Sequence, residues 1–161
     1  MQNFLLIGAF VILGILILSI NSTIFITNKA ITENEVHITG IGLGQALIEE
    51  ITSRAFDEKT TGSKKVTSPE QLTGVNNLGK ESGEPPFDDV DDYNNFSRKI
   101  DTPRIDGYEI FVKVGYADPS MPRNFINMRT FLKRIEVTIK NPKFMHNPDS
   151  LLFATVVSYF K

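Results

Sequence analysis

The chain opens with a long apolar run and turns hydrophilic abruptly after it. Residues 4–20 read FLLIGAFVILGILILSI, and residues 24–26 continue the run after a short polar NST. The first 28 residues contain no charged side chain, whereas the remaining 133 contain all 36. Because a helix rises about 1.5 Å per residue, about 20 such residues span the roughly 30 Å hydrocarbon core of a bilayer. The pattern predicts an apolar N-terminal helix that is shielded from water, followed by a water-soluble domain, the head.

The apolar run has three possible interpretations. A cleaved secretory signal has a basic start and a small-residue cleavage site, and no Lys or Arg precedes Phe4. A buried core helix fits poorly with 17 almost uninterrupted apolar residues near the terminus. We therefore expect a retained anchor, with residues 1–28 forming a transmembrane or filament-core helix. Lys29 is the only basic residue nearby, so charge bias says little about orientation; the short N-terminal side favours a head outside the cytoplasm.

Residues 29–58 continue the helical pattern in a more polar sequence, and they predict an amphipathic helix that packs on the head. The predicted packing stripe recurs mostly at spacings of three and seven, and it consists of Ile31, Ile38, Ile41, Leu47, Ile48, Ile51 and Ala55. Gly40, Gly42 and Gly44 each cost about 1 kcal/mol relative to Ala within a helix. They indicate either a kink or close-packing face, or a segment able to unwind.

Residues 59–107 are rich in turn formers and predict a loop region, held in place by local contacts of its apolar side chains. Residues 108–161 predict an antiparallel sheet, because apolar and polar side chains alternate in 108–116 and 131–140. Residues 151–160 (LLFATVVSYF) are apolar throughout, which is typical of a central or doubly covered strand. The expected fold class is α+β, with one long N-terminal helix packed on a small antiparallel sheet.

Composition and motifs narrow the candidate functions. The net charge is −2 and there is no Cys, so we expect no nucleic-acid partner, no disulfide framework and no thiolate metal site. His37 and His146 are the only histidines, and the motifs of serine hydrolases and zinc proteases do not occur. We therefore expect a protein that is not an enzyme.

An acidic segment, residues 87–96 (FDDVDDYNNF), is the most concentrated charge in the chain. Its four acids are Asp88, Asp89, Asp91 and Asp92. Mutual repulsion of these carboxylates needs compensation, and a calcium ion that takes six to eight oxygen ligands is one candidate. The alternative is a structural turn whose side chains cap backbone N–H groups while Phe87, Val90, Tyr93 and Phe96 pack inward. Apart from this calcium possibility, we expect no cofactor.

The order of these elements resembles type IV pilins and type II secretion pseudopilins. Two stretches, residues 46–58 and 87–93, are similar to minor pilins of the mannose-sensitive haemagglutinin pilus type, and the strands near 135–139 and 156–159 fit the same pattern. The chain departs from pilin precursors in two ways. No Gly precedes Phe4, and the acidic residue of the fifth mature position is absent, since Leu5 or Gly8 would stand there.

The resemblance implies a structural subunit, of the minor kind, that is stored in the cytoplasmic membrane and assembles through its apolar helix. Its partners would be other pilin-like subunits, membrane lipid and the inner-membrane assembly machinery. Assembly would place it in the periplasm or at the cell surface. The residues expected to pack between helices, with glycines for close approach, are Phe4, Leu5, Ile7, Gly8, Phe10, Val11, Leu13, Gly14, Ile15, Leu16, Ile17 and Leu18.

Two other functions stay open. The first is a single-pass accessory subunit of a larger envelope or membrane complex that does not polymerise. The second is an anchored extracytoplasmic binding domain whose acidic segment forms a calcium-dependent site.

Overall fold

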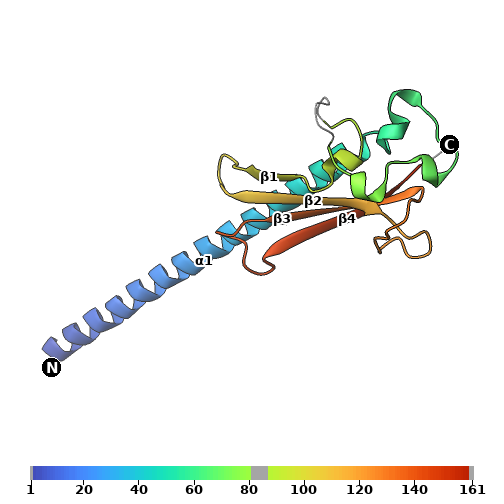
Figure 1. Cartoon of the computed structure of the whole chain (residues 1–161). Helices are drawn as coiled ribbons and strands as arrows, with labels where there is room; N and C mark the ends of the chain where they lie inside the picture. Colours follow the sequence, from blue (N-terminus) through green and yellow to red (C-terminus); the bar gives the residue numbers. More distant parts are fainter. Residues whose placement is uncertain (1, 81–86, 160–161) are drawn as a thin grey trace.

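The structure, a computed structural model, describes residues 2–80 and 87–159. It has the predicted α+β arrangement, with one long helix packed along a four-stranded antiparallel sheet (Figure 1). Its elements in chain order are α1 (Gln2–Thr52), the 3₁₀ helices η1 (Glu58–Ser63), η2 (Pro69–Gln71), η3 (Val75–Asn77) and η4 (Asp91–Tyr93), and the strands β1 (Ser97–Ile100), β2 (Tyr108–Tyr116), β3 (Leu132–Lys140) and β4 (Ser150–Ser158).

Helix α1 is continuous from the apolar half into the polar half. The polar step at residues 21–23 does not break it, and the Thr23 hydroxyl donates a hydrogen bond to the Ser19 carbonyl within the helix at 2.9 Å. The helix ends at Thr52, six residues before the predicted boundary at 58. Asp57 instead caps η1, where its carboxylate accepts the Lys59 N–H at 3.0 Å. The prediction of a long helix is confirmed, and its end was placed too late.

The sheet-facing side of α1 is built around two glycines. Val36, Gly40, Gly44 and Ile51 are its buried residues. A Cβ atom at Gly44 would lie 2.3 Å from the ring of Phe153, and one at Gly40 would lie 3.1 Å from the Leu151 side chain. The missing side chains therefore let strand β4 approach the helix closely. The structure supports the close-packing interpretation for these two positions.

The predicted packing stripe of α1 is wrong in its first half and confirmed near the end of the helix, where Leu47, Ile48 and Ile51 pack on the core. Ile31, Ile38 and Ile41 are 55%, 70% and 39% exposed, whereas Ile51 is fully buried as predicted. Ala55 lies beyond the helix. The prediction assumed that the bulky face of the helix meets the head. In the structure the sheet supplies the bulk, through Leu151 and Phe153, and the helix supplies the glycines.

The four strands are antiparallel neighbours in the order β1-β2-β3-β4. The predicted alternation of β2 and β3 is confirmed, because the inward residues Ile110, Val112, Val114, Ile135, Val137 and Ile139 are all buried in the main core. Two expectations were wrong. Strand β1 lies inside the predicted loop region, and β4 is an edge strand that pairs with β3 alone among the described residues.

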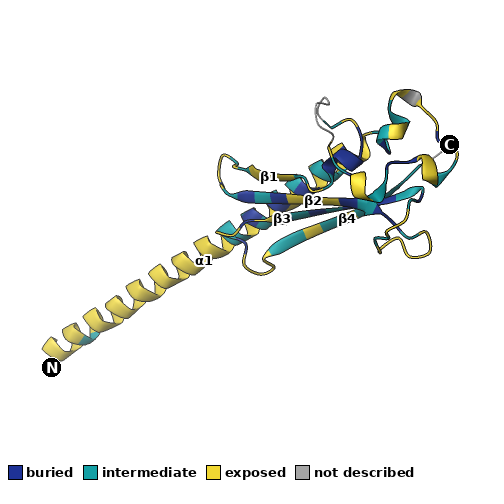
Figure 2. Ribbon diagram, viewed as in Figure 1, coloured by how far each residue is buried: buried dark blue, intermediate teal, exposed yellow. Residues whose placement is uncertain are grey.

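The loop region is held in place by contacts of its apolar side chains, as predicted, and it lies at one end of the sheet. Val66, Leu72, Leu78 and Tyr116 form a second buried cluster there, with Phe56 and Tyr159 packed around it. Figure 2 shows the result: buried residues concentrate in the head, and the N-terminal half of α1 projects from it almost wholly exposed.

Candidate functional site

The projecting half of α1 is the largest unpartnered apolar surface in the described chain. The ten large residues expected to pack between helices are 50–82% exposed. They are Phe4, Leu5, Ile7, Phe10, Val11, Leu13, Ile15, Leu16, Ile17 and Leu18. Gly8 and Gly14 have open space around the position of a Cβ atom. By length and composition, α1 is the one described helix that could cross a membrane.

The exposed apolar surface does not stop where the apolar run stops. Phe10, Ile17, Ile24, Ile31 and Ile38 follow one another at intervals of seven residues. A second row with the same interval consists of Leu6, Leu13, Ile20, Thr27, Asn34 and Ile41. At 3.6 residues per turn, seven residues are nearly two turns, so each row forms a line along the helix. We call these two rows the outer seam.

The outer seam lies on the side of α1 away from the sheet. Ile38 follows the buried Val36 by two residues, about 200° around the helix. The opposite side meets the head near the turn at Phe144, where Lys29 and Glu33 line a hollow with Lys143 and His146. Glu35 anchors the helix to the head through Arg104, at 2.9 Å.

The acidic segment folds into a compact turn around η4. Phe87, Tyr93 and Phe96 pack ring against ring, with the Phe87 and Tyr93 centroids 4.6 Å apart. The Asp92 carboxylate accepts the N–H groups of Asp88 at 3.0 Å and Asp89 at 3.5 Å, and the Asp89 carboxylate accepts the Asp92 N–H at 3.1 Å. These contacts are those of the structural-turn interpretation.

Lys133 is the centre of a buried charge cluster beneath this turn. Its fully buried ammonium group donates to the Phe56 carbonyl and to Asp57, both at 2.8 Å, and makes a short ion pair with Asp91. It also lies over the Phe56 ring, 4.6 Å from the centroid. The Tyr116 hydroxyl donates to Asp57 at 3.2 Å, which adds a fourth partner to the cluster. Lys133 thus ties the end of α1, the acidic segment and β3 together.

The carboxyl groups of the cluster hold different charges. Burial alone would raise the pKa of Asp57, but the charge of Lys133 and the hydrogen bonds to Lys133, the Lys59 N–H and Thr73 outweigh it and leave the pKa lowered. Burial, followed by the charge of Asp91, raises the pKa of Asp89 to about 8. Burial also raises the pKa of Asp91 to about 6, against the attraction of Lys133.

Asp89 and Asp91 interact beside a buried oxygen that has no partner in the described part of the chain. The Asp91 Oδ2 is buried and has no hydrogen-bond partner among the described residues. The neighbouring Asp89 carboxyl, held protonated by its burial, can donate to Asp91. The cluster then carries two negative charges against Lys133 rather than three.

The four aspartates do not converge as one set of metal ligands. Asp91 faces Lys133, and Asp92 caps backbone N–H groups. Asp88 and Asp89 instead meet Glu58, with one oxygen of each within 4.8 Å of the others. The sequence prediction missed Glu58 because nothing in its spacing links it to the acidic segment. It also missed Lys133, although this residue is in phase with the buried Ile135 and Val137 of β3.

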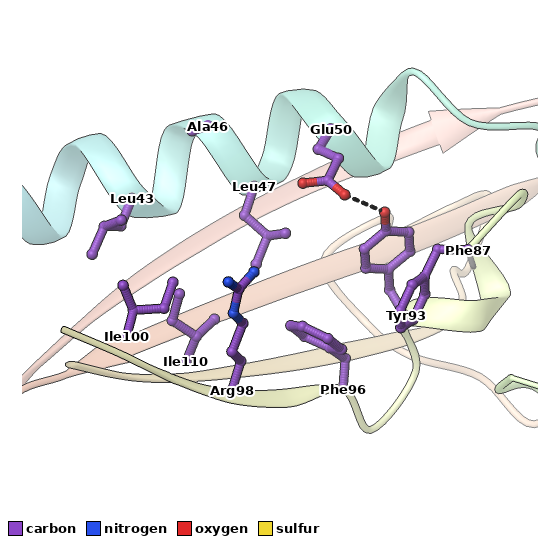
Figure 3. Close-up of a pocket in the computed structure, with 10 residues that line it drawn as sticks. All are labelled: Leu43, Ala46, Leu47, Glu50, Phe87, Tyr93, Phe96, Arg98, Ile100 and Ile110. Carbon is purple, nitrogen blue, oxygen red and sulfur yellow. Dashed lines mark hydrogen bonds between the residues drawn. The ribbon is translucent and has the colours of Figure 1, made fainter. Parts of the chain in front are cut away.

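A cavity of about 290 Å³ lies between α1 and strands β1 and β2 (Figure 3). Its walls are mainly apolar, with Leu43 and Leu47 facing Ile100 and Ile110. At one end the Tyr93 hydroxyl donates to Glu50 at 2.7 Å, and burial raises the pKa of this tyrosine to about 12. This hydrogen bond occupies the Tyr93 hydroxyl and one Glu50 oxygen, and Arg98 is the third polar residue in the lining.

The structure thus places the predicted residues in two separate regions. The helix-packing set lies on the exposed N-terminal half of α1, which we call the stem. The acidic set lies in the head beside the end of α1. Comparison of the chain with protein-family models, with curated proteins and with solved structures gives no match.

Proposed function

We propose that this protein is a structural subunit of a type IV pilus or type II secretion filament, of the minor kind, and that it assembles through α1. The observation that carries the proposal is the outer seam. A lone membrane anchor needs apolar side chains only over about 20 residues. Here the seam continues through Ile31, Ile38 and Ile41, which lie beside the head in the polar half of the helix.

The seven-residue repeat specifies what kind of partner suits this surface. Repeats of this interval are buried when helices pack side by side with a slight left-handed twist. Isoleucine in both rows favours bundles of more than two helices. Asn34, a polar residue within an apolar row, would fix the register between helices. The partners are therefore parallel α1-like helices of other pilin-like subunits.

In this proposal the two halves of α1 serve different stages. Before assembly, the stem lies in the cytoplasmic membrane, with the head outside the cytoplasm, and lipid covers its apolar residues. During assembly the inner-membrane machinery transfers the stem into the bundle, where helix contacts replace lipid contacts. The head remains on the outside of the filament. The role is structural, and the proposal assigns no catalysis.

A photo-crosslinking residue tests the proposal. Placed at Ile31 in the full chain in membranes, it should crosslink to a protein that also has an apolar N-terminal helix. Placed at Lys29, which faces the head on the opposite side of α1, it should not. Mass spectrometry of the crosslinked product identifies the partner, and electron microscopy shows whether filaments contain it.

The alternative function is an accessory subunit of a membrane complex that does not polymerise. It also accommodates a helical partner on the outer seam. The stoichiometry separates the two functions, because a fixed single copy in a defined complex without filaments favours the accessory subunit. An Ile31 probe that reacts only with lipid would refute both.

A further inference from the structure

Among the described residues, strand β4 pairs with β3 only, so its other edge is free. The Tyr159 N–H donates to the Phe131 carbonyl at 3.0 Å, one residue beyond the last pair of the β3–β4 ladder. Hydrogen-bonded pairs alternate in an antiparallel ladder. The backbone groups of Val157, Thr155, Phe153 and Leu151 therefore point to β3, and those of Leu152, Ala154, Val156 and Ser158 point outward. From Leu152 to Ser158, four N–H and four C=O groups line the free edge.

The two edges of the sheet differ in a way that matters for pairing. Strand β1, at the other edge, has four residues, and two of them are Arg98 and Lys99. Short, charged edges resist pairing with other chains. Strand β4 has nine residues (SLLFATVVS) without a charge, a proline or a glycine. This composition is typical of a strand that has neighbours on both sides.

The space beside β4 also suits a further strand. A groove of about 470 Å³ runs between the edge and helix α1, and it is lined by Gln45, Ile48, Glu49, Leu152, Phe153 and Ala154. Side chains of an added strand would point alternately into this groove and to the other face of the sheet. On that other face Leu152 is 62% exposed and offers an apolar contact.

We propose that the β4 edge binds an extended, uncharged segment of a different polypeptide, which adds a fifth strand to the sheet. A segment that pairs from Leu152 to Ser158 covers about seven residues, roughly 23 Å. The residues that face the groove are small and preferably β-branched, such as Val and Thr, because Ile48 and Phe153 line it together with the polar Gln45 and Glu49. This inference does not depend on the bundling of α1.

The geometry disfavours a second copy of this chain as the occupant. Antiparallel pairing of β4 with β4 of another copy has a twofold axis perpendicular to the sheet. Figure 1 shows that the stem of α1 leaves the head at one end of the sheet. The twofold axis would send the second stem out at the opposite end. One membrane or one parallel bundle does not accommodate both stems.

Amide hydrogen exchange of the full chain in detergent micelles tests the proposal residue by residue. The probe is a peptide of about nine alternating Thr and Val residues, the length of β4, with a solubilising Lys at each end. We expect it to slow exchange at Leu152, Ala154, Val156 and Ser158 by at least about tenfold. Exchange at Phe153, Thr155 and Val157, whose amides already face β3, should stay unchanged.

Matched controls make the result specific. The same peptide with Asp in place of Val should protect none of these amides. Ala154→Pro removes one outward N–H without removing a bond to β3, so it should weaken the protection at the other three outward amides, whereas Ala154→Thr should keep it. The proposal is wrong if the peptide slows no outward amide, or if it slows all β4 amides alike. It is also wrong if outward amides become protected with rising protein concentration and no peptide.

Discussion

Substituting alanine for the glycines of α1 separates close packing from intrinsic helix stability. At Gly42 a Cβ atom meets nothing within 4 Å, so Gly42→Ala gains only helix propensity, about 1 kcal/mol. At Gly44 the new atom would lie 2.3 and 2.5 Å from two carbons of the Phe153 ring. Overpacking of this kind costs about 1–3 kcal/mol, which outweighs the propensity gain. We expect Gly44→Ala to be destabilising by about 1 kcal/mol.

Gly40 provides an intermediate case. A Cβ atom there would lie 3.1 Å from Leu151 Cδ1 and 3.3 Å from Met145 Cε, the flexible ends of two side chains. These ends can move by a few tenths of an ångström, so Gly40→Ala should be close to neutral. The three variants are expected to rank in stability as Gly42→Ala, then Gly40→Ala, then Gly44→Ala.

Thermal and urea unfolding of the full chain in detergent, followed by tyrosine fluorescence, measures this ranking. A difference of about 2 kcal/mol between Gly42→Ala and Gly44→Ala should separate their Tm values by several degrees. Phe153→Leu removes the clashing ring. In that background Gly44→Ala should therefore cost less stability than it does in the wild type. If Gly44→Ala is as stable as Gly42→Ala, the close approach of α1 and β4 is wrong.

Three further predictions concern the charge cluster. Lys133→Met leaves Asp57 and Asp91 without their buried counter-charge, so it should destabilise the head by about 3–5 kcal/mol in urea unfolding. The control Lys140→Met, at an exposed site of the same strand, should change stability little. The pKa of Asp89 is raised to about 8, so the contribution of its protonated form to stability is complete below about pH 4 and is lost as the pH rises to about 8. Wild-type stability should therefore fall over this interval, and Asp89→Asn should flatten the fall. Millimolar calcium should leave the Tm unchanged, since Lys133 already compensates Asp91; a rise that EDTA reverses and Asp88→Asn abolishes would contradict this.

Periodicity in the sequence predicted the elements but not how their faces are used. The alternation in β2 and β3 identified Ile110, Val112 and Ile135 as inward residues because each strand has one covered face. The same logic failed for α1, where bulky residues were assumed to be buried. Packing complementarity depends on both surfaces, and a helix face can be buried because it is small. Only the positions of Leu151 and Phe153 reveal that Gly40 and Gly44 form the contact.

The edge position of β4 and the role of Lys133 have different causes. Apolar composition predicts that a strand is covered, but it does not say whether its own chain provides the cover. In β4 the composition is that of a central strand while the topology leaves one edge free. Lys133, by contrast, was detectable, because a lysine in phase with buried residues requires an anion. Its partner Asp57 lies 76 residues away, and no local pattern connects them.

The outer seam and the β4 edge lie on different sides of the molecule, and this separation has a consequence for assembly. The seam follows the face of α1 that points away from the sheet, whereas the free edge lies at the side of the sheet. A neighbouring helix on Ile31 and Ile38 would therefore leave the backbone groups of Ala154 and Val156 accessible. A subunit held in a bundle by its stem could still take a strand from another protein at its head. Variants of the seam should thus abolish helix crosslinking without changing peptide protection of β4, and Ala154→Pro should do the reverse.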